Sequence, residues 1–199
     1  GWAEYSFRHP TFPGDALTIR AELDAEPLSG SWKVEMINQS DEVCVVGKVG
    51  LGKAVWSHEL IRPESMHPTA ESQRKGPLTL ENAETGKDWA AMKLDFTRET
   101  SEEFTTQKQL TDNPLFTSIN CIAHPSWISG WAEKLLRHNF DIPNSMHTRS
   151  RVQHHRELAI GTTVVGGAHL IDAYERKAHD FANFDVLLQD QYGSDIAQL

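Results

Sequence analysis

The residues of this sequence best suited to chemistry are those that can transfer a proton or hold an anion: Asp112, His124, His147 and Arg149. His124 stands at the predicted start of a helix, where the helix dipole and the nearby amide groups favour an anion. His147 and Arg149 are two residues apart on a predicted strand, and alternate residues of a strand share one face. Both are therefore expected to face one pocket, and the pattern predicts acid–base chemistry on a small molecule.

Each of these residues also has a plain structural explanation. Asp112-Asn113-Pro114 is a common turn or helix-entry sequence, and His124 is suited to cap the helix that Pro125 begins. His154 and His155 look like a metal-binding pair, but neighbours on a strand point to opposite faces. The sequence therefore predicts no metal site, and no cofactor is expected.

The first part of the chain, residues 1–54, is predicted to be an antiparallel meander without a helix. Strands are expected where apolar, β-branched and aromatic residues alternate or run together. The expected strands are Trp2–Phe7, Ala16–Leu23, Trp32–Asn38 and Val43–Leu51. Residues 55–87 contain prolines among many polar residues and are predicted to be a linker that crosses the surface.

Residues 88–199 form the predicted second module. It opens with an expected strand at Trp89–Thr97, and apolar residues then recur at helical spacing, which predicts one amphipathic helix at about residues 120–140. Three long strands are expected after the helix, at Met146–His154, Thr162–Arg176 and Ala178–Gln189. This order predicts an α+β fold in which a curled antiparallel sheet wraps around one central helix.

A motif that occurs twice relates the two modules. The segment from Arg8 to Ile19 contains a turn at Gly14, and it is echoed by the segment from Gln153 to Val164 with its turn near Gly161. Each copy is followed by a long strand that ends in a polar turn. A turn signal that recurs in the same order with similar spacing indicates a duplicated supersecondary unit.

Bulk composition limits the class of partner. The formal charge of -9 argues against nucleic acid, because phosphate binding needs a basic face. No apolar run is long enough to cross a bilayer, so no membrane partner is expected. The two cysteines, Cys44 and Cys121, are isolated, which suits a reducing compartment, with the cytoplasm as the expectation and an organelle lumen as the alternative.

Six short segments carry a family resemblance through their order along the chain. They are Phe12-Pro13-Gly14-Asp15, Asn38-Gln39, Asn113-Pro114-Leu115, Ala123-His124-Pro125, His147-Thr148-Arg149-Ser150 and Tyr174-Glu175-Arg176-Lys177. Together they resemble the hotdog fold and, within it, the MaoC-like acyl-thioester hydratases and dehydratases. The resemblance covers most of the chain outside residues 55–87. It implies a double hotdog, in which two antiparallel sheets are each curled around a central helix.

The resemblance also implies a reaction, the addition of water to an α,β-unsaturated acyl thioester of coenzyme A or an acyl carrier protein, or the reverse. Family members use the Asp and His of Asp-x-Asn-Pro-Leu-His as the acid–base pair, and Thr111 and Phe116 stand at those positions here. The expected substitutes are Asp112 as base and His124 as acid. The expected substrate-binding residues are Asn113, His147 and Arg149.

A second departure from the family pattern, besides Thr111 and Phe116, leaves alternatives open. Pro125 stands where the family has a Gly whose N–H polarises the thioester carbonyl, and proline has no N–H. One alternative is a hotdog enzyme repurposed for isomerisation, cyclisation or thioester hydrolysis of a natural-product intermediate. Another is a non-catalytic hotdog subunit that completes a partner's active site, so the expected assembly is a homodimer or a hetero-oligomer with another hotdog chain.

The first module lacks the helix that the resemblance implies for it. Residues 1–54 would form a sheet with a bare apolar face, and a soluble protein rarely sustains such a surface. The sequence therefore predicts a fragment of a longer protein, or a chain whose missing helix is supplied by a partner.

Overall fold

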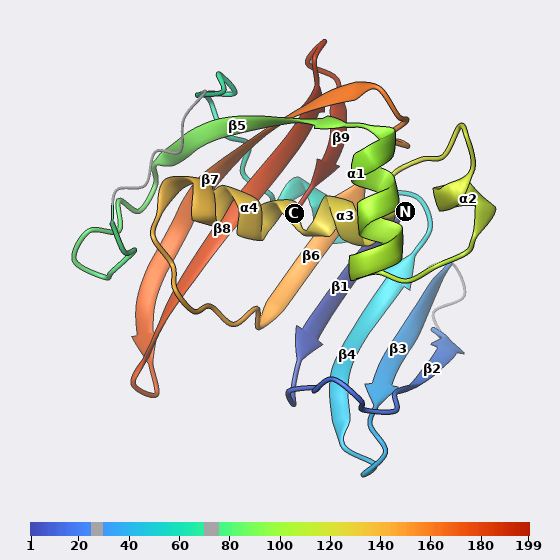
Figure 1. The fold of residues 1–199 in the computed structure, drawn as a ribbon. Helices are drawn as coiled ribbons and strands as arrows, with labels where there is room; N and C mark the ends of the chain where they lie inside the picture. Colours follow the sequence, from blue (N-terminus) through green and yellow to red (C-terminus); the bar gives the residue numbers. More distant parts are fainter. Residues whose placement is uncertain (25–29, 70–75) are drawn as a thin grey trace. The chain divides into compact units, whose positions relative to one another are not determined.

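The computed structural model describes residues 1–24, 30–69 and 76–199, and Figure 1 shows its ribbon. The chain divides into two compact units. Unit 1 comprises residues 1–59 and 144–154, and unit 2 comprises residues 60–143 and 155–199. Residues 144–154, which were expected in the second module, thus pack with the first, and most of the predicted linker packs with the second.

Unit 1 is an antiparallel sheet with the strand order β2-β3-β4-β1-β6. Its elements are β1 (Trp2–Phe7), β2 (Thr18–Leu23), β3 (Ser31–Ile37), β4 (Val43–Gly50), the 3-10 helix η1 (Val55–His58) and β6 (Arg149–His154). The first four strands lie where the sequence predicts them, within two residues at each end. The last strand begins at Arg149 and not at Met146. The described residues of unit 1 contain no α-helix.

The two faces of the unit 1 sheet differ in chemistry, because alternate residues point to opposite sides. One face carries charged side chains, among them Glu4, Lys33 and Lys48, which the strand register places side by side. The other face is apolar. Its members include Tyr5, Phe7, Ile19, Leu23, Trp32, Val34 and Met36.

Unit 2 contains an antiparallel sheet with the strand order β9-β8-β7-β5 and all the α-helices found in the described residues. Its strands are β5 (Asp88–Phe96), β7 (Thr162–Arg176), β8 (His179–Asp190) and β9 (Asp195–Gln198). Its helical segments are α1 (Arg98–Glu103), the π-helical turn η2 (Phe104–Lys108), α2 (Pro114–Thr117), α3 (Pro125–Ser129) and α4 (Trp131–Asn139). Helix α4 lies across one face of β5 and β7 (Figure 1).

The predicted single helix at about residues 120–140 is two helices in the structure. Helix α3 begins at Pro125, whose fixed φ suits the first turn of a helix, and α3 and α4 are separated at Gly130. The apolar residues predicted from helical spacing do face the sheet, since Trp131 and Leu135 are fully buried. A Cβ on Gly166 of β7 would lie 2.6 Å from the Trp131 ring, so the absence of a side chain there allows the close contact.

The two units repeat one supersecondary structure, as the sequence motif predicts. The meander β2-β3-β4 of unit 1 corresponds to β7-β8-β9 of unit 2. In unit 1 the Gln39 side-chain oxygen accepts a hydrogen bond from the Ala16 N–H at 3.0 Å. In unit 2 the Gln191 side-chain oxygen accepts from the Thr163 N–H at 3.1 Å.

Further hydrogen bonds occur in both copies at matching positions. Asn38 Oδ1 accepts from two amides of the turn after β3, and Asp190 Oδ1 does the same in the turn after β8. The N–H of Arg8 donates to the Cys44 carbonyl at 2.7 Å, and that of His155 donates to the Ile196 carbonyl at 2.9 Å. These equivalences support the duplication and give the residues of β2 counterparts in β7.

The segment after η1 is attached to the unit 2 sheet by carboxylates. Asp185 accepts a hydrogen bond from the Ile61 N–H at 2.7 Å. Asp88 accepts from the Glu64 N–H at 2.7 Å and pairs with His169 Nδ1 at 2.7 Å. Pro68 then forms a parallel bridge with Ala91 of β5. The described part of residues 60–87 is therefore held to the sheet by specific hydrogen bonds.

Candidate functional site

His124 is the cap of helix α3. Its Nδ1 accepts a hydrogen bond from the Ser126 N–H at 3.1 Å, and its carbonyl accepts from the Trp127 N–H at 2.9 Å. A neutral imidazole whose Nδ1 accepts must carry its proton on Nε2. The structural explanation of His124 as a helix cap is thus confirmed, and the ring is left with an N–H that can donate a hydrogen bond.

Two aromatic rings flank His124. The ring centroid of Phe116 lies 4.6 Å away and that of Phe104 lies 5.9 Å away. Burial lowers the pKa of His124 below its ordinary 6.5, because the charged form loses its solvation. The sequence resemblance predicts Phe116 at the position of the family's histidine, and the His124 ring lies beside Phe116. Phe104 was not predicted, because nothing in the local sequence shows that η2 packs against the start of α3.

The start of α3 does not offer the anion site that the sequence predicts. Pro125 has no N–H. The Ser126 N–H is occupied by the His124 ring, and the Trp127 N–H is bonded within the first turn. An anion could reach the Ser126 amide only if the His124 ring moved away.

Asp112 and Asn113 lie in the exposed loop before α2. Asn113 Oδ1 accepts a hydrogen bond from the Leu115 N–H at 3.0 Å and so caps α2. The carbonyl of Asp112 accepts from Thr117 Oγ1 at 3.5 Å. Among the described residues no hydrogen bond joins the Asp112 carboxylate to His124, so the structure does not bring the predicted base and acid into contact.

A buried pair holds helix α2, which carries Phe116. Ser101 Oγ donates to the Phe116 carbonyl at 3.2 Å and lies 3.3 Å from Cys121 Sγ. Ser101 and Cys121 are both buried. The sequence did not indicate this pair, which joins residues far apart in the chain and places Phe116 beside His124.

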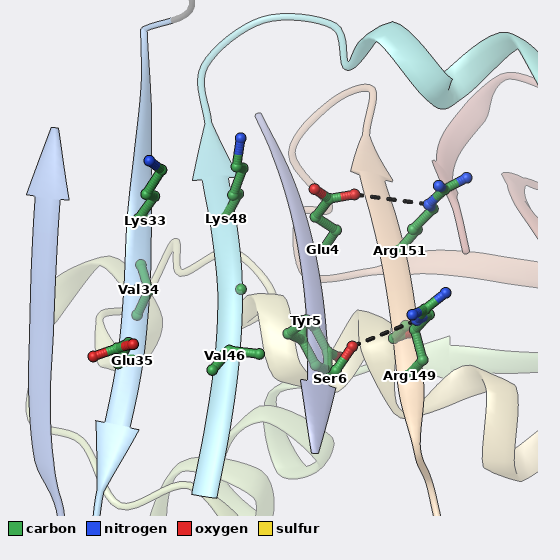
Figure 2. A pocket seen from close by; sticks show the side chains of 12 residues that line it. Glu4, Tyr5, Ser6, Lys33, Val34, Glu35, Val46, Lys48, Arg149 and Arg151 are labelled. Carbon is green, nitrogen blue, oxygen red and sulfur yellow. Dashed lines mark hydrogen bonds and ion pairs between the residues drawn. The ribbon is translucent and has the colours of Figure 1, made fainter. Parts of the chain in front are cut away.

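His147 and Arg149 lie in unit 1 and face opposite sides of its sheet. The His147 ring centroid is 5.5 Å from that of Phe7 on the apolar face. Arg149 Nε is 3.4 Å from Ser6 Oγ on the charged face (Figure 2). The prediction that both face one pocket is therefore wrong, because His147 precedes β6 and does not follow its alternation.

The charged face of unit 1 is hollowed, with a volume of about 460 Å³, and Figure 2 shows the side chains that line it. Lys48 and Lys33 both contact the Asp24 carboxylate, at 2.9 Å and 3.6 Å. Arg151 contacts Glu4 at 3.7 Å and Glu59 at 2.8 Å. Since these charges neutralise one another, the hollow shows no excess of one sign that would select a ligand.

Neither a metal centre nor a membrane span is found in the described ranges. Residues 1–24, 30–69 and 76–199 hold no cluster of three or more His, Cys, Asp or Glu side chains that could bind a metal ion. Within the same ranges no helix is both long and apolar enough to span a membrane.

Acidification below about pH 6.5 is expected to destabilise the fold through His124 and His138. Burial lowers the pKa of both below 6.5, so the unfolded chain binds more protons than the folded protein as the pH falls through this range. Their effect is absent above about pH 6.5 and grows toward the folded pKa values. Urea midpoints at about pH 7.5 and about pH 5.5 would measure the loss. The His124→Asn/His138→Gln variant should lose less, and an equal loss would contradict this origin.

Comparison with known proteins adds evidence on the fold. The sequence matches no protein-family model and no curated protein sequence. Solved structures do resemble it. A MaoC domain protein from Chloroflexus aurantiacus J-10-fl, described as a dehydratase, has 12% sequence identity and a TM-score of 0.64, and the match covers 98% of this chain and 72% of that protein.

Two Mycobacterium tuberculosis structures are also similar. A protein with a double hotdog fold has 13% identity and a TM-score of 0.58, over 99% of this chain and 72% of its own. The C-terminally truncated HadBC complex, a 3R-hydroxyacyl-ACP dehydratase, has 16% identity and a TM-score of 0.51, over 60% of this chain and 95% of its own. At such identities the likeness concerns the fold.

Proposed function

We propose that this chain, which has the double hotdog fold seen in MaoC-like dehydratases, is an acyl-thioester hydro-lyase. It would add water across, or remove water from, the α,β bond of an acyl group carried by coenzyme A or an acyl carrier protein. The observation that supports this function best is His124, a partly buried imidazole with its proton on Nε2, held beside Phe116 at the family's catalytic position.

The proposed dehydration assigns one proton to each residue. Asp112 takes the proton from Cα of a 3-hydroxyacyl thioester, and His124 Nε2 donates its proton to the departing hydroxyl, which leaves as water. His124 gives up this proton as the imidazolium, because a neutral ring that lost its Nε2 proton would become an imidazolate. Its lowered pKa makes the imidazolium a stronger acid, and protonation of Nδ1 breaks the hydrogen bond from the Ser126 N–H. Asp112 lies in an exposed loop, so the mechanism requires this loop to approach the substrate when it binds.

Turnover of a short enoyl-CoA by the purified protein tests the proposal, followed as loss of the enoyl-thioester absorbance. His124→Asn retains a helix-capping side chain but removes the acid, and it is expected to lower kcat by about 10²–10⁴-fold with little change in stability. Asp112→Asn is expected to lower kcat over the same range. His138→Gln is the control and should leave kcat unchanged. Equal kcat in wild type and His124→Asn would refute the assignment.

A second candidate is a non-catalytic hotdog subunit. It is favoured by Thr111 and Phe116 at the positions of the family's acid–base pair, and by Pro125, which has no N–H, at the position of the family's carbonyl donor. HadBC is an example of a complex of this fold class. A wild-type chain that binds acyl-CoA but turns over neither enoyl nor 3-hydroxyacyl thioesters would support this candidate.

A further inference from the structure

The repeat exposes a difference between the two sheets. In unit 2, strand β7 has a neighbour on each edge, β8 and β5. Among the described residues its counterpart in unit 1, β2, pairs with β3 alone and forms the edge of the sheet (Figure 1). We propose that the outer edge of β2 and the adjoining apolar face form a docking surface for a strand–helix segment, built like β5 to α4, that lies outside residues 1–199.

The backbone of β2 is oriented to accept such a strand. The Asp24 N–H donates to the Ser31 carbonyl at 2.9 Å, so Asp24 faces β3. Because N–H groups alternate in direction along a strand, those of Ile19, Ala21 and Leu23 point outward. In unit 2 the counterpart of Leu23 is Leu170, which donates to the Lys87 carbonyl at 2.9 Å and accepts from the Gly86 N–H at 2.8 Å. The same pair of backbone groups is thus bonded in unit 2, whereas in unit 1 no described residue bonds to it.

The side chains show the same contrast. Leu170 and Ala168 are 0% exposed, whereas Leu23 is 70% exposed and the counterpart of Ala168, Ala21, is also exposed. Ile19 is 65% exposed, and its counterpart Gly166 lies directly under the Trp131 ring of α4. The apolar face of unit 1 therefore continues to the outer edge of β2. At the equivalent edge of its own sheet, beside β7, unit 2 has strand β5 and helix α4.

Charges on the opposite face specify the docking strand further. Glu22 is the counterpart of His169, which pairs with Asp88 of β5 at 2.7 Å. A strand beside β2 would meet Glu22 and Arg20 on its charged side and Ile19, Ala21 and Leu23 on its apolar side. In the docking strand, apolar residues therefore alternate with charged ones. A basic residue lies opposite Glu22 and an acidic residue lies opposite Arg20. An amphipathic helix with an apolar stripe like that of α4 follows it.

A second copy of this chain is a rival occupant. Two β2 strands could pair antiparallel about Ala21, with Arg20 opposite Glu22 of the second copy. That arrangement would bond the edge but would leave the apolar face of both copies without a helix. The strand–helix segment covers both features, and the proposal commits to it.

The test adds to unit 1 a copy of the strand–helix segment that unit 2 already contains. A copy of residues 87–147 placed directly before Gly1 reproduces the spacing between β5 and β6. Hydrogen exchange of the Ile19, Ala21 and Leu23 amides is expected to slow by about 100-fold or more relative to the 199-residue chain. The first melting transition should rise by about 5 °C or more. Leu23→Lys in the extended protein should abolish both effects, and the control Val55→Lys, at an exposed residue, should not.

Two results would overturn the proposal. In one, the three amides of the extended protein exchange as fast as in the 199-residue chain. In the other, light scattering finds the 199-residue chain as a dimer with these amides already protected, and Leu23→Lys separates it into monomers. The second result would assign the edge to another copy of the chain.

Discussion

Leu170→Ala is expected to lower the free energy of unfolding by about 3 kcal/mol, whereas Leu23→Ala should change it by less than about 0.5 kcal/mol. The two leucines occupy equivalent positions of the repeat, but Leu170 is 0% and Leu23 is 70% exposed. Truncating Leu170 leaves a cavity beneath packed neighbours, and truncating Leu23 removes a side chain that is mostly in water.

Urea denaturation of the two variants and the wild type, followed by tryptophan fluorescence and by circular dichroism, would measure both changes. Each variant serves as the control for the other, because both replace a leucine by alanine at equivalent positions of the repeat. The two positions differ in burial. Equal losses at both positions would mean that Leu23 is covered in solution, and the exposed edge of β2 would have to be reconsidered.

Gly166→Val is expected to destabilise unit 2 by about 3 kcal/mol, the upper part of the range for overpacked cores. The new Cβ would lie 2.6 Å from the Trp131 ring and 3.0 Å from Leu188, and both of these side chains are fully buried. Neither can move without displacing other core residues.

Two further variants separate this clash from a general cost of replacing glycine. Gly130→Ala, whose Cβ would meet only ordinary contacts at 3.5 Å between α3 and α4, should be neutral or stabilising. Trp131→Leu removes the ring that the valine would strike. The Gly166→Val/Trp131→Leu pair should therefore lose at least about 1 kcal/mol less than the sum of the single changes. Additive losses would show that the clash is not the cause.

Much of the fold could be predicted because its signals are local. Alternating apolar residues located β1 to β4 and β7, and the turns near Gly14 and Gly161 revealed the duplication. The break at Gly130 was missed because the apolar spacing continues across it. The membership of β6 in unit 1 depends on pairing between Trp2 and Gln153, and no local pattern reports a contact between residues so far apart.

The candidate site was less predictable for the same reason. His124 as a helix cap follows from its neighbour Pro125, and the structure bears it out. Its aromatic neighbours come from η2 and α2, whose packing no spacing rule describes. His147 was misplaced because the two-residue alternation applies only inside a strand, and β6 begins after it.

The interleaving of the two units along the chain has a consequence for biosynthesis. Strand β1 is made before its partner β6, and the whole first part of unit 2 is made between them. Pairing over such a sequence separation is slow, because the intervening loop must close first. On the ribosome, β1 must therefore wait with one edge unpaired until about three-quarters of the 199 residues have been translated. No single cut in the gene would yield unit 1 intact.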